Sequence, residues 1–268
     1  MNKQIRSDTL KKLAMLFMLI DHIGAIVIEK IYITTIDAQK AQILFDVNQV
    51  MRAVGRLAMP IFCYQMAVGL IRTRSRLKHI FLLAVAAILS EVPFDLGSSG
   101  VIFAPSYQNV IFTLLLGTIS LILIEWFSNS DLYKSIDSEI VKKIAYALFT
   151  TLSVFSMSAI AELAHTDYGA KGVILIWIFY FFMNDRLKMS TYGIVLFLIE
   201  MAFITYLRTH SINEVMKYCN FEAYACLSFP LIAMDNGERR GGNVLKWFGY
   251  AFYPVHQLVL YLIAMALT

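Results

Sequence analysis

Two adjacent residues, Asp21 and His22, are the first candidates for chemistry because they stand in a stretch that is otherwise apolar. An ionised side chain in such a stretch is costly unless it is paired or hydrated, and it often marks a functional site. Histidine changes its protonation state near neutral pH, which is the property that a general base requires. The sequence therefore predicts that His22 is a catalytic base, oriented by Asp21 or by Glu91.

Two further pairs of charged residues stand in apolar stretches. Arg52 and Arg56 are four residues apart, and so are Glu91 and Asp95. Side chains with this spacing share one face of a helix, so the two pairs could meet across a helix interface. One interpretation is a buried ion-pair network that fixes helix packing. The other is a site in which Arg52, Arg56 and Asp95 bind substrate.

Lys11 and His22 are eleven residues apart, which places both on one face of a helix at a separation of about 16 Å. A cation at one end and a base at the other suit a long ligand with an anionic head and a reactive tip. Coenzyme A thioesters have this shape. The alternative is that Lys11 only anchors a helix end by extending its ammonium group toward water.

The composition is that of a membrane protein. Of the 268 residues, 59% are hydrophobic and 16% are charged, and the mean hydropathy is +0.65. Soluble proteins carry about a quarter charged residues, so a soluble enzyme, a disordered chain and a disulfide scaffold are excluded. The three cysteines show neither metal nor disulfide spacing. No metal site and no nucleic-acid partner are predicted.

The apolar runs predict an all-α polytopic membrane protein that forms one transmembrane domain over residues 1–268. Nine spans are expected, with eight as the alternative because the sixth and eighth runs are short. The predicted spans are Leu10–Ile28, Val50–Ile71, Ile80–Leu96, Val110–Phe127, Ile144–Leu163, Gly172–Met183, Tyr192–Leu207, Phe221–Met234 and Trp247–Leu267.

Lysine and arginine are concentrated before the first predicted span and in every second connection after it. Short cytoplasmic loops retain these cations, whereas exported loops lose them. The distribution therefore predicts a cytoplasmic N-terminus and a C-terminus outside.

Six sequence blocks occur in order from one end of the chain to the other. They are LKKLAMLFMLIDHIG (10–24), RAVGRLAMPIFCY (52–64), SEVPFDL (90–96), QNVIFTLLLG (108–117), DYGAKGV (167–173) and KWFGYAFYPVHQL (246–258). Together they resemble the TraX family. The resemblance implies a protein of the bacterial cytoplasmic (inner) membrane, and the type member of the family N-acetylates the pilin subunit of conjugative pili.

The spacing of Lys11 and His22 is also similar to a pattern of type-three integral-membrane acyltransferases, in which an arginine precedes a catalytic histidine by the same interval. This chain has lysine there, which lacks the bidentate fork of arginine. The resemblances imply an acyltransferase that moves an acetyl or other short acyl group from cytoplasmic acetyl-CoA to an exported acceptor. The acceptor group is an amine or a hydroxyl, with a pilin N-terminus as one candidate.

This hypothesis assigns roles to the remaining polar residues of the blocks and loops. Arg56 or Asn109 steadies the thioester oxyanion. The acceptor is positioned by Tyr168, Lys171, Tyr253 and His256, and the donor phosphates are bound by Lys11, Lys12, Arg239, Arg240 and Lys246.

Two other classes of function remain open on the sequence. Buried His, Glu and Arg side chains are also used by proton-coupled secondary transporters. A non-enzymatic membrane assembly factor would use the same charges only for packing. Both share the lipid bilayer as a partner, but neither needs acyl-CoA.

Overall fold

The computed structural model describes residues 4–268, apart from the side chains of residues 200, 204, 208, 217–220 and 243. The described residues form helices and no strand, which confirms the predicted all-α class. Outside the helices, two isolated backbone bridges join Ile5 to Asp235 and Gln108 to Thr166.

The helices follow one another with short connections. Their bounds are α1 (Ser7–His22), the π-helix η1 (Ile23–Ile28), α2 (Glu29–Thr34), α3 (Ala38–Gly55), α4 (Ala58–Arg72), α5 (Arg76–Ser99), α6 (Val110–Asn129), α7 (Asp131–Lys134), α8 (Glu139–Leu163), α9 (Gly169–Phe181), α10 (Arg186–Thr209), α11 (Ile212–Glu222), the 3₁₀-helix η2 (Ala223–Leu227), α12 (Ser228–Ala233) and α13 (Gly242–Leu267).

Short polar side chains set the starts of the long helices. Asp37, Ser75, Asn109, Ser138 and Asp185 each accept a hydrogen bond from a backbone N–H in the first turn of the helix that follows. Such N-caps satisfy backbone donors that have no partner within the helix. The polar residues between the apolar runs therefore fix where each helix begins.

Six helical stretches of the described chain are long and apolar enough to cross a membrane. They are Ala38–Arg72, Arg76–Ser99, Val110–Asn129, Glu139–Leu163, Arg186–Leu207 and Val244–Leu267. These six overlap six of the predicted spans. Gly169–Phe181 and Ala223–Ala233, where the short sixth and eighth spans were predicted, are apolar helices below that length. The count of nine and the orientation of the termini remain predictions.

Two predicted spans have different bounds in the structure. The first was predicted to end at Ile28. In the structure, helical backbone continues from Ser7 through α1, η1 and α2 to Thr34. The second was predicted to begin at Val50, but helix starts at Ala38 and is interrupted only by a turn at Arg56 and Leu57. Arg56 therefore lies at a helix junction rather than within a regular turn, which frees it to reach partners on other helices.

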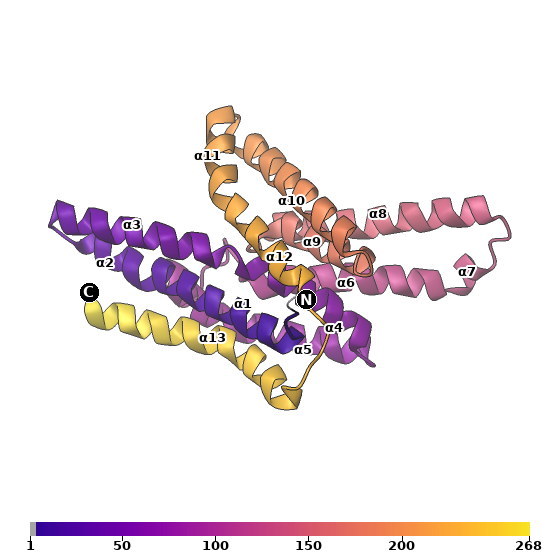
Figure 1. Cartoon of the computed structure of the whole chain (residues 1–268), viewed down its shortest axis with the longest axis horizontal. Coiled ribbons are helices and arrows are strands. Elements are labelled where there is room, and N and C mark those ends of the chain that lie inside the picture. The colour runs from indigo at the N-terminus through magenta and orange to yellow at the C-terminus, as the bar shows by residue number, and fades with distance from the viewer. Residues whose placement is uncertain (1–3) are drawn as a thin grey trace.

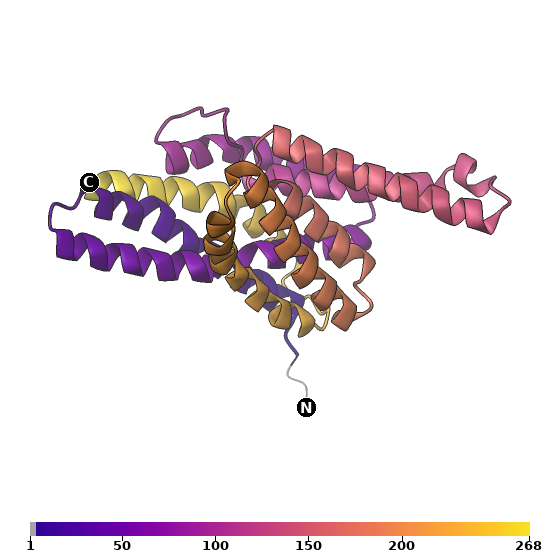
Figure 2. The same cartoon turned by 90° about the horizontal axis from the view of Figure 1, so that it is seen from above.

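Groups of helices extend from a common centre. In Figures 1 and 2, α1 with α2, α3 and α13 lie along one another toward one end, where the C-terminus lies near the connection between α2 and α3. The α6–α8 hairpin extends toward the opposite end. Helix α4 lies in the centre and packs against α1, α9 and α12. Its inward side chains, among them Ile61, Cys63 and Leu70, are fully buried.

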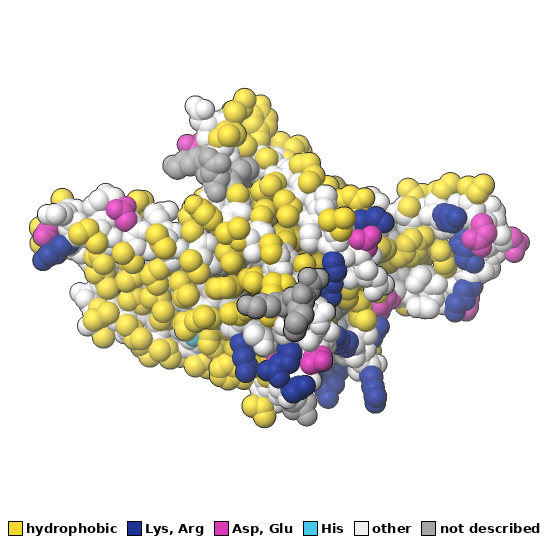
Figure 3. Space-filling view, in the orientation of Figure 1, with side chains coloured by type: hydrophobic (Ala, Val, Ile, Leu, Met, Phe, Trp, Pro, Cys, Tyr) yellow, Lys and Arg dark blue, Asp and Glu magenta, His cyan; other side chains and the backbone are white. Residues whose placement is uncertain are grey.

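The outer surface is that of a protein surrounded by lipid. Figure 3 shows hydrophobic side chains over most of the visible face, with Lys and Arg gathered near the start of α13 and at the far end of the α6–α8 hairpin. Large apolar side chains such as Phe81, Leu148 and Phe155 are more than half exposed. Apolar surface on this scale requires a hydrocarbon environment, so the chain is a multi-pass helical membrane protein.

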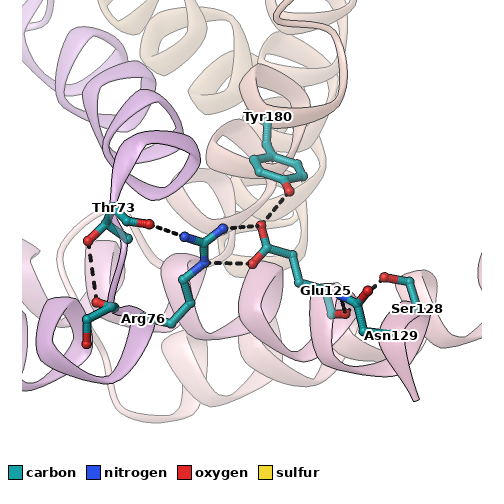
Figure 4. Close-up of polar contacts among 7 residues, drawn as sticks. Thr73, Arg76, Glu125, Ser128, Asn129 and Tyr180 are labelled. Atoms are coloured by element: carbon teal, nitrogen blue, oxygen red, sulfur yellow. Dashed lines mark hydrogen bonds and ion pairs between the residues drawn. The ribbon is translucent and has the colours of Figure 1, made fainter. Parts of the chain in front are cut away.

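A cluster of polar side chains joins α5, α6 and α9 (Figure 4). Glu125 of α6 accepts hydrogen bonds from Arg76 Nε of α5 at 2.9 Å and from the hydroxyl of Tyr180 of α9 at 2.7 Å. The carboxylate also lies 3.3 Å from Arg76 Nη2, which makes the arginine contact bidentate.

Replacing Glu125 by Ala should destabilise the protein by about 1–3 kcal/mol, because two half-buried donors lose their acceptor. Thermal unfolding in detergent should show a lower midpoint than for wild type. Asp137→Ala, which removes an exposed carboxylate in the α7–α8 connection, is the matched control. Equal midpoints for the two variants would show that the Glu125 cluster does not hold these helices.

Candidate active site

A polar cavity of about 270 Å³ lies among α1, α3, α5 and α13, beside the connections before α6 and α9. Its wall combines apolar side chains with an unusual number of polar ones. The polar lining residues are Asp21, His22, Glu29, Arg52, Arg56, Ser98, Tyr107, Asp167, Tyr168, Tyr253 and Gln257. Six of the residues predicted from sequence thus line one cavity: Asp21, His22, Arg52, Arg56, Tyr168 and Tyr253.

His22 forms a hydrogen bond with His256 across the α1–α13 interface. Nδ1 of His22 lies 2.6 Å from Nε2 of His256, and the two rings are nearly parallel, with an interplanar angle of 7° and centroids 4.9 Å apart. His256 is buried, and its Nδ1 lies 2.6 Å from the carbonyl oxygen of Phe252. The structure therefore orients His22 through His256, and not through Asp21 or Glu91 as predicted.

These contacts assign the proton positions of a neutral pair. A carbonyl oxygen only accepts, so His256 carries its proton on Nδ1 and donates to Phe252. Its Nε2 is then an acceptor, and His22 must donate from Nδ1. The lone pair of His22 is left on Nε2. This is the tautomer that a base in the cavity would use.

The backbone is irregular directly after His22. Residues Ile23–Ile28 form a π-helix within the otherwise α-helical run from Ser7 to Thr34, and such insertions recur at functional sites. A Cβ at Gly24, inside this segment, would lie 2.7 Å from Oδ1 of Asn48 on α3. A larger residue at this position would therefore displace the Asn48 side chain and crowd α3.

Asp21 and Arg52 form an ion pair at the cavity wall, with Nη1 of Arg52 2.6 Å from Oδ2 of Asp21. The other oxygen, Oδ1, is buried and has no hydrogen-bond partner among the described residues. A side chain at Gly55 of α3 would overlap Asp21, so this glycine makes room for the pair. Asp21 therefore compensates the charge of Arg52 through one oxygen, while its other oxygen is enclosed by the protein.

Arg56 is held by residues of two other segments, the end of α11 and the connection before α9. Its Nη1 lies 3.0 Å from Oε1 of Glu222 at the end of α11 and donates to the hydroxyl of Tyr168 at 3.3 Å. The ring of Phe221 lies 5.2 Å from its guanidinium carbon. Glu222 is only 2% exposed. The sequence analysis did not select Glu222 as a site residue, although an acid in an apolar run was the available signal.

The structure does not pair the two arginines with Glu91 and Asp95. Asn109, the N-cap of α6, donates from its side-chain amide to the carboxylate of Glu91 and to the carbonyl of Ala87. Asp95 accepts from the backbone N–H of Ala104 at 2.8 Å. These three side chains hold the α5–α6 connection in place, and none lines the cavity. Glu91 and Asp95 are not available to the arginines because they accept hydrogen bonds from the α5–α6 connection and from the N-cap of α6.

The connection before α6 is tied to the connection before α9. Tyr107 donates to Oδ1 of Asp167 at 2.6 Å, and the backbone N–H of Asp167 donates to the carbonyl of Gln108 at 2.9 Å. Burial raises the pKa of Asp167, and the hydrogen bond from Tyr107 and the charge of Lys171 oppose that rise. Lys171 does not line the cavity; its ammonium lies 4.8 Å from the ring centroid of Tyr168.

The predicted donor residues lie around the starts of α1 and α13, away from the cavity lining. Nζ of Lys11 donates to the carbonyl of Leu245 at 3.1 Å, and Lys246 lies over the ring of Trp247. Arg239 donates to Oε1 of Gln65 at 3.3 Å. The backbone N–H groups of Arg240 and Gly241 donate to Asp8. Lys12 lines a separate apolar groove between α1 and α13.

Asp235 organises this basic region and was missed by the sequence analysis. Its carboxylate accepts from the hydroxyls of Ser7 and Tyr64, each at 2.8 Å, and Arg186 donates to the Tyr64 hydroxyl at 2.9 Å. Asp235 thus ties the N-terminal segment and the connection before α13 to α4 and α10.

The fold and the cavity define a polytopic helical membrane protein in which His22, paired with the buried His256, lines a charged cavity. The family described as "TraX protein" has a model that matches residues 6–264, nearly the whole chain, and the chain belongs to the TraX family. No curated protein and no solved structure matches the chain. The described residues include no group of three or more His, Cys, Asp or Glu side chains that could hold a metal ion.

The proton assignment of the histidine pair predicts a specific NMR result. In protein labelled with ¹⁵N-histidine, His22 and His256 should both appear as neutral rings protonated on Nδ1, and His256→Phe should shift the His22 signals by removing its acceptor. The chain has five histidines, so His22→Gln and His256→Phe spectra supply the assignments. Protonation of His22 on Nε2 in the wild type would contradict the assignment.

Proposed function

We propose that this TraX-family protein is an integral-membrane acyltransferase. It moves an acetyl or other short acyl group from acyl-CoA on the cytoplasmic side of a bacterial cytoplasmic membrane to an amine or hydroxyl of an exported acceptor. The observation that carries the proposal is the His22–His256 pair, because it leaves a lone pair on His22 Nε2 in a cavity large enough for a small reacting group.

The transfer step needs only groups of this chain and its two substrates. Nε2 of His22 takes a proton from the acceptor amine or hydroxyl as that atom attacks the thioester carbonyl carbon. The tetrahedral intermediate collapses by breaking the carbon–sulfur bond. The thiolate leaving group then takes the proton from His22, which regenerates the neutral pair and releases coenzyme A.

Arg56 is the better of the two predicted oxyanion donors. The amide of Asn109 is committed to Glu91 and Ala87, whereas Arg56 lines the cavity and its buried Nε has no partner among the described groups. A fixed donor aimed at the developing charge is worth about 2.7–4 kcal/mol in other acyl-transfer enzymes. Glu222 and Tyr168 hold the guanidinium in place for this role.

The carboxylates of the cavity favour an amine acceptor over a hydroxyl. The charges of Asp21 and Arg52 neutralise each other. The charge of Arg56 is neutralised by Glu222, which does not itself line the cavity. Asp167 and Glu29 add negative charge to the same wall. An acceptor ammonium group would be attracted to this wall; it loses one proton to water, and the neutral amine then gives a second proton to His22 as it attacks. A pilin N-terminus is one acceptor of that chemistry.

The donor phosphates are assigned to the basic cluster at the start of α1 and α13. The positive charges of Arg239 and Lys246 lie near enough to Lys11 to disfavour its protonated form. A donor anchored at Lys11 has to span about 16 Å along α1 to bring its thioester to His22. The pantetheine arm of coenzyme A is a slender group suited to that reach.

His22→Ala should reduce acyl transfer by about 10²–10⁴-fold, which is the usual contribution of a positioned general base. The assay is transfer of labelled acetyl from acetyl-CoA to an amine-bearing peptide by the purified protein. Size-exclusion behaviour and far-UV circular dichroism establish that the variant is folded. His210→Asn removes a histidine outside the cavity and keeps a residue that tolerates the positive φ of 50°; it should remain active. Full activity of His22→Ala would overturn the proposal.

The acceptor KM should depend on the protonation of Asp167. Because the carboxylate attracts the ammonium group, KM should be lowest above the raised pKa of Asp167 and should increase as pH falls through it. Tyr107→Phe removes a hydrogen bond that lowers this pKa. The midpoint of the KM profile should therefore move to higher pH in the variant. An unmoved midpoint would exclude Asp167 from acceptor binding.

A further inference from the structure

A second hollow lies against a different face of α1 from the cavity described above. It is a groove of about 570 Å³ between α1 and α13, and apart from Lys12 and Gly241 every lining residue is apolar. Leu16, Val244 and Phe248 line it and are at least half exposed. The groove therefore opens to the hydrocarbon around the protein rather than to water.

The two ends of the groove differ in chemistry. One end has Lys12, which has no hydrogen bond or ion pair with another described residue. Trp247, 55% exposed and stacked beneath Lys246, lies beside the same end. Exposed tryptophan and lysine are typical of the level of lipid headgroups. The other end is closed by Phe252, whose ring stacks on His256.

The two neighbouring lysines of α1 are directed to different places. Lys11 is bound to the carbonyl of Leu245, and a residue one step along a helix points about 100° away. Lys12 accordingly lies in the groove lining while Lys11 does not. Lys12 was predicted to bind the donor phosphates together with Lys11, but the structure places it in the groove lining, apart from the contacts of Lys11 and Arg239.

We propose that this groove binds one acyl chain of an anionic phospholipid, with the lipid phosphate at Lys12. A hydrocarbon chain fits this groove because, apart from Lys12 at one end, its wall has no polar side chain. The pantetheine arm of coenzyme A fits less well, because its amides would be desolvated there without partners. The proposal does not depend on acyl transfer, since it rests on the lining and charge of the groove alone.

The test uses full-length protein in nanodiscs that contain a phosphatidylglycerol probe with a photoactivatable group in its acyl chain. Cross-linked peptides are identified by mass spectrometry, with a phosphatidylcholine probe as the reference. We expect labelling of residues 12–19 and 241–252 above that of other exposed helices, and about fivefold more with phosphatidylglycerol, given about 1 kcal/mol per lysine for anionic lipid.

Two variants locate the site. Lys12→Gln should remove the preference for phosphatidylglycerol, and Leu16→Trp should reduce groove labelling by filling it. The matched controls are Lys143→Gln, an exposed lysine of α8, and Leu152→Trp, on the exposed face of α8; both should label as wild type. Equal labelling over all exposed helices, equal labelling by the two probes, or displacement of the probe by coenzyme A would each overturn the lipid assignment.

Discussion

An ionised side chain is stable within a membrane-spanning bundle only when another group compensates its charge, and this requirement determines how the helices of this protein meet. Asp21 of α1 compensates Arg52 of α3, and Glu222 of α11 compensates Arg56 at the junction of α3 and α4. Each pair joins segments that are distant in sequence. The cavity exists because these pairs bring polar side chains from several helices to one place.

The histidine pair depends on the same assembly. His22 comes from the first helix and His256 from the last, and their contact is fixed by the carbonyl of Phe252 one turn earlier in α13. A π-helix begins after His22, and the glycines at positions 24 and 55 allow α3 to approach. The reactivity assigned to His22 is therefore a property of three helices. The change of a single glycine would alter the site without removing any of its polar groups.

Much of the site could be predicted from sequence because charges in apolar runs are conspicuous. Asp21, His22, Arg52 and Arg56 were selected for that reason, and they line one cavity. Their partners could not be predicted, because a spacing of four residues fixes a helix face and not the helix that it meets. Glu91 and Asp95 have the same spacing, yet they satisfy an N-cap and a connection close by. Helix class and most span positions follow from hydropathy, whereas the π-helix has no sequence signal that would have revealed it.

The most direct test of the account is a sided transfer measurement in proteoliposomes, with labelled acetyl-CoA on one side of the membrane and an amine-bearing peptide on the other. The account predicts that label accumulates on the peptide in vesicles that contain the protein and not in empty vesicles. It also predicts that blocking the peptide amine prevents the transfer. Absence of labelled peptide in vesicles that hold folded protein and intact substrates would contradict the assignment of the His22–His256 cavity as an acyl-transfer site.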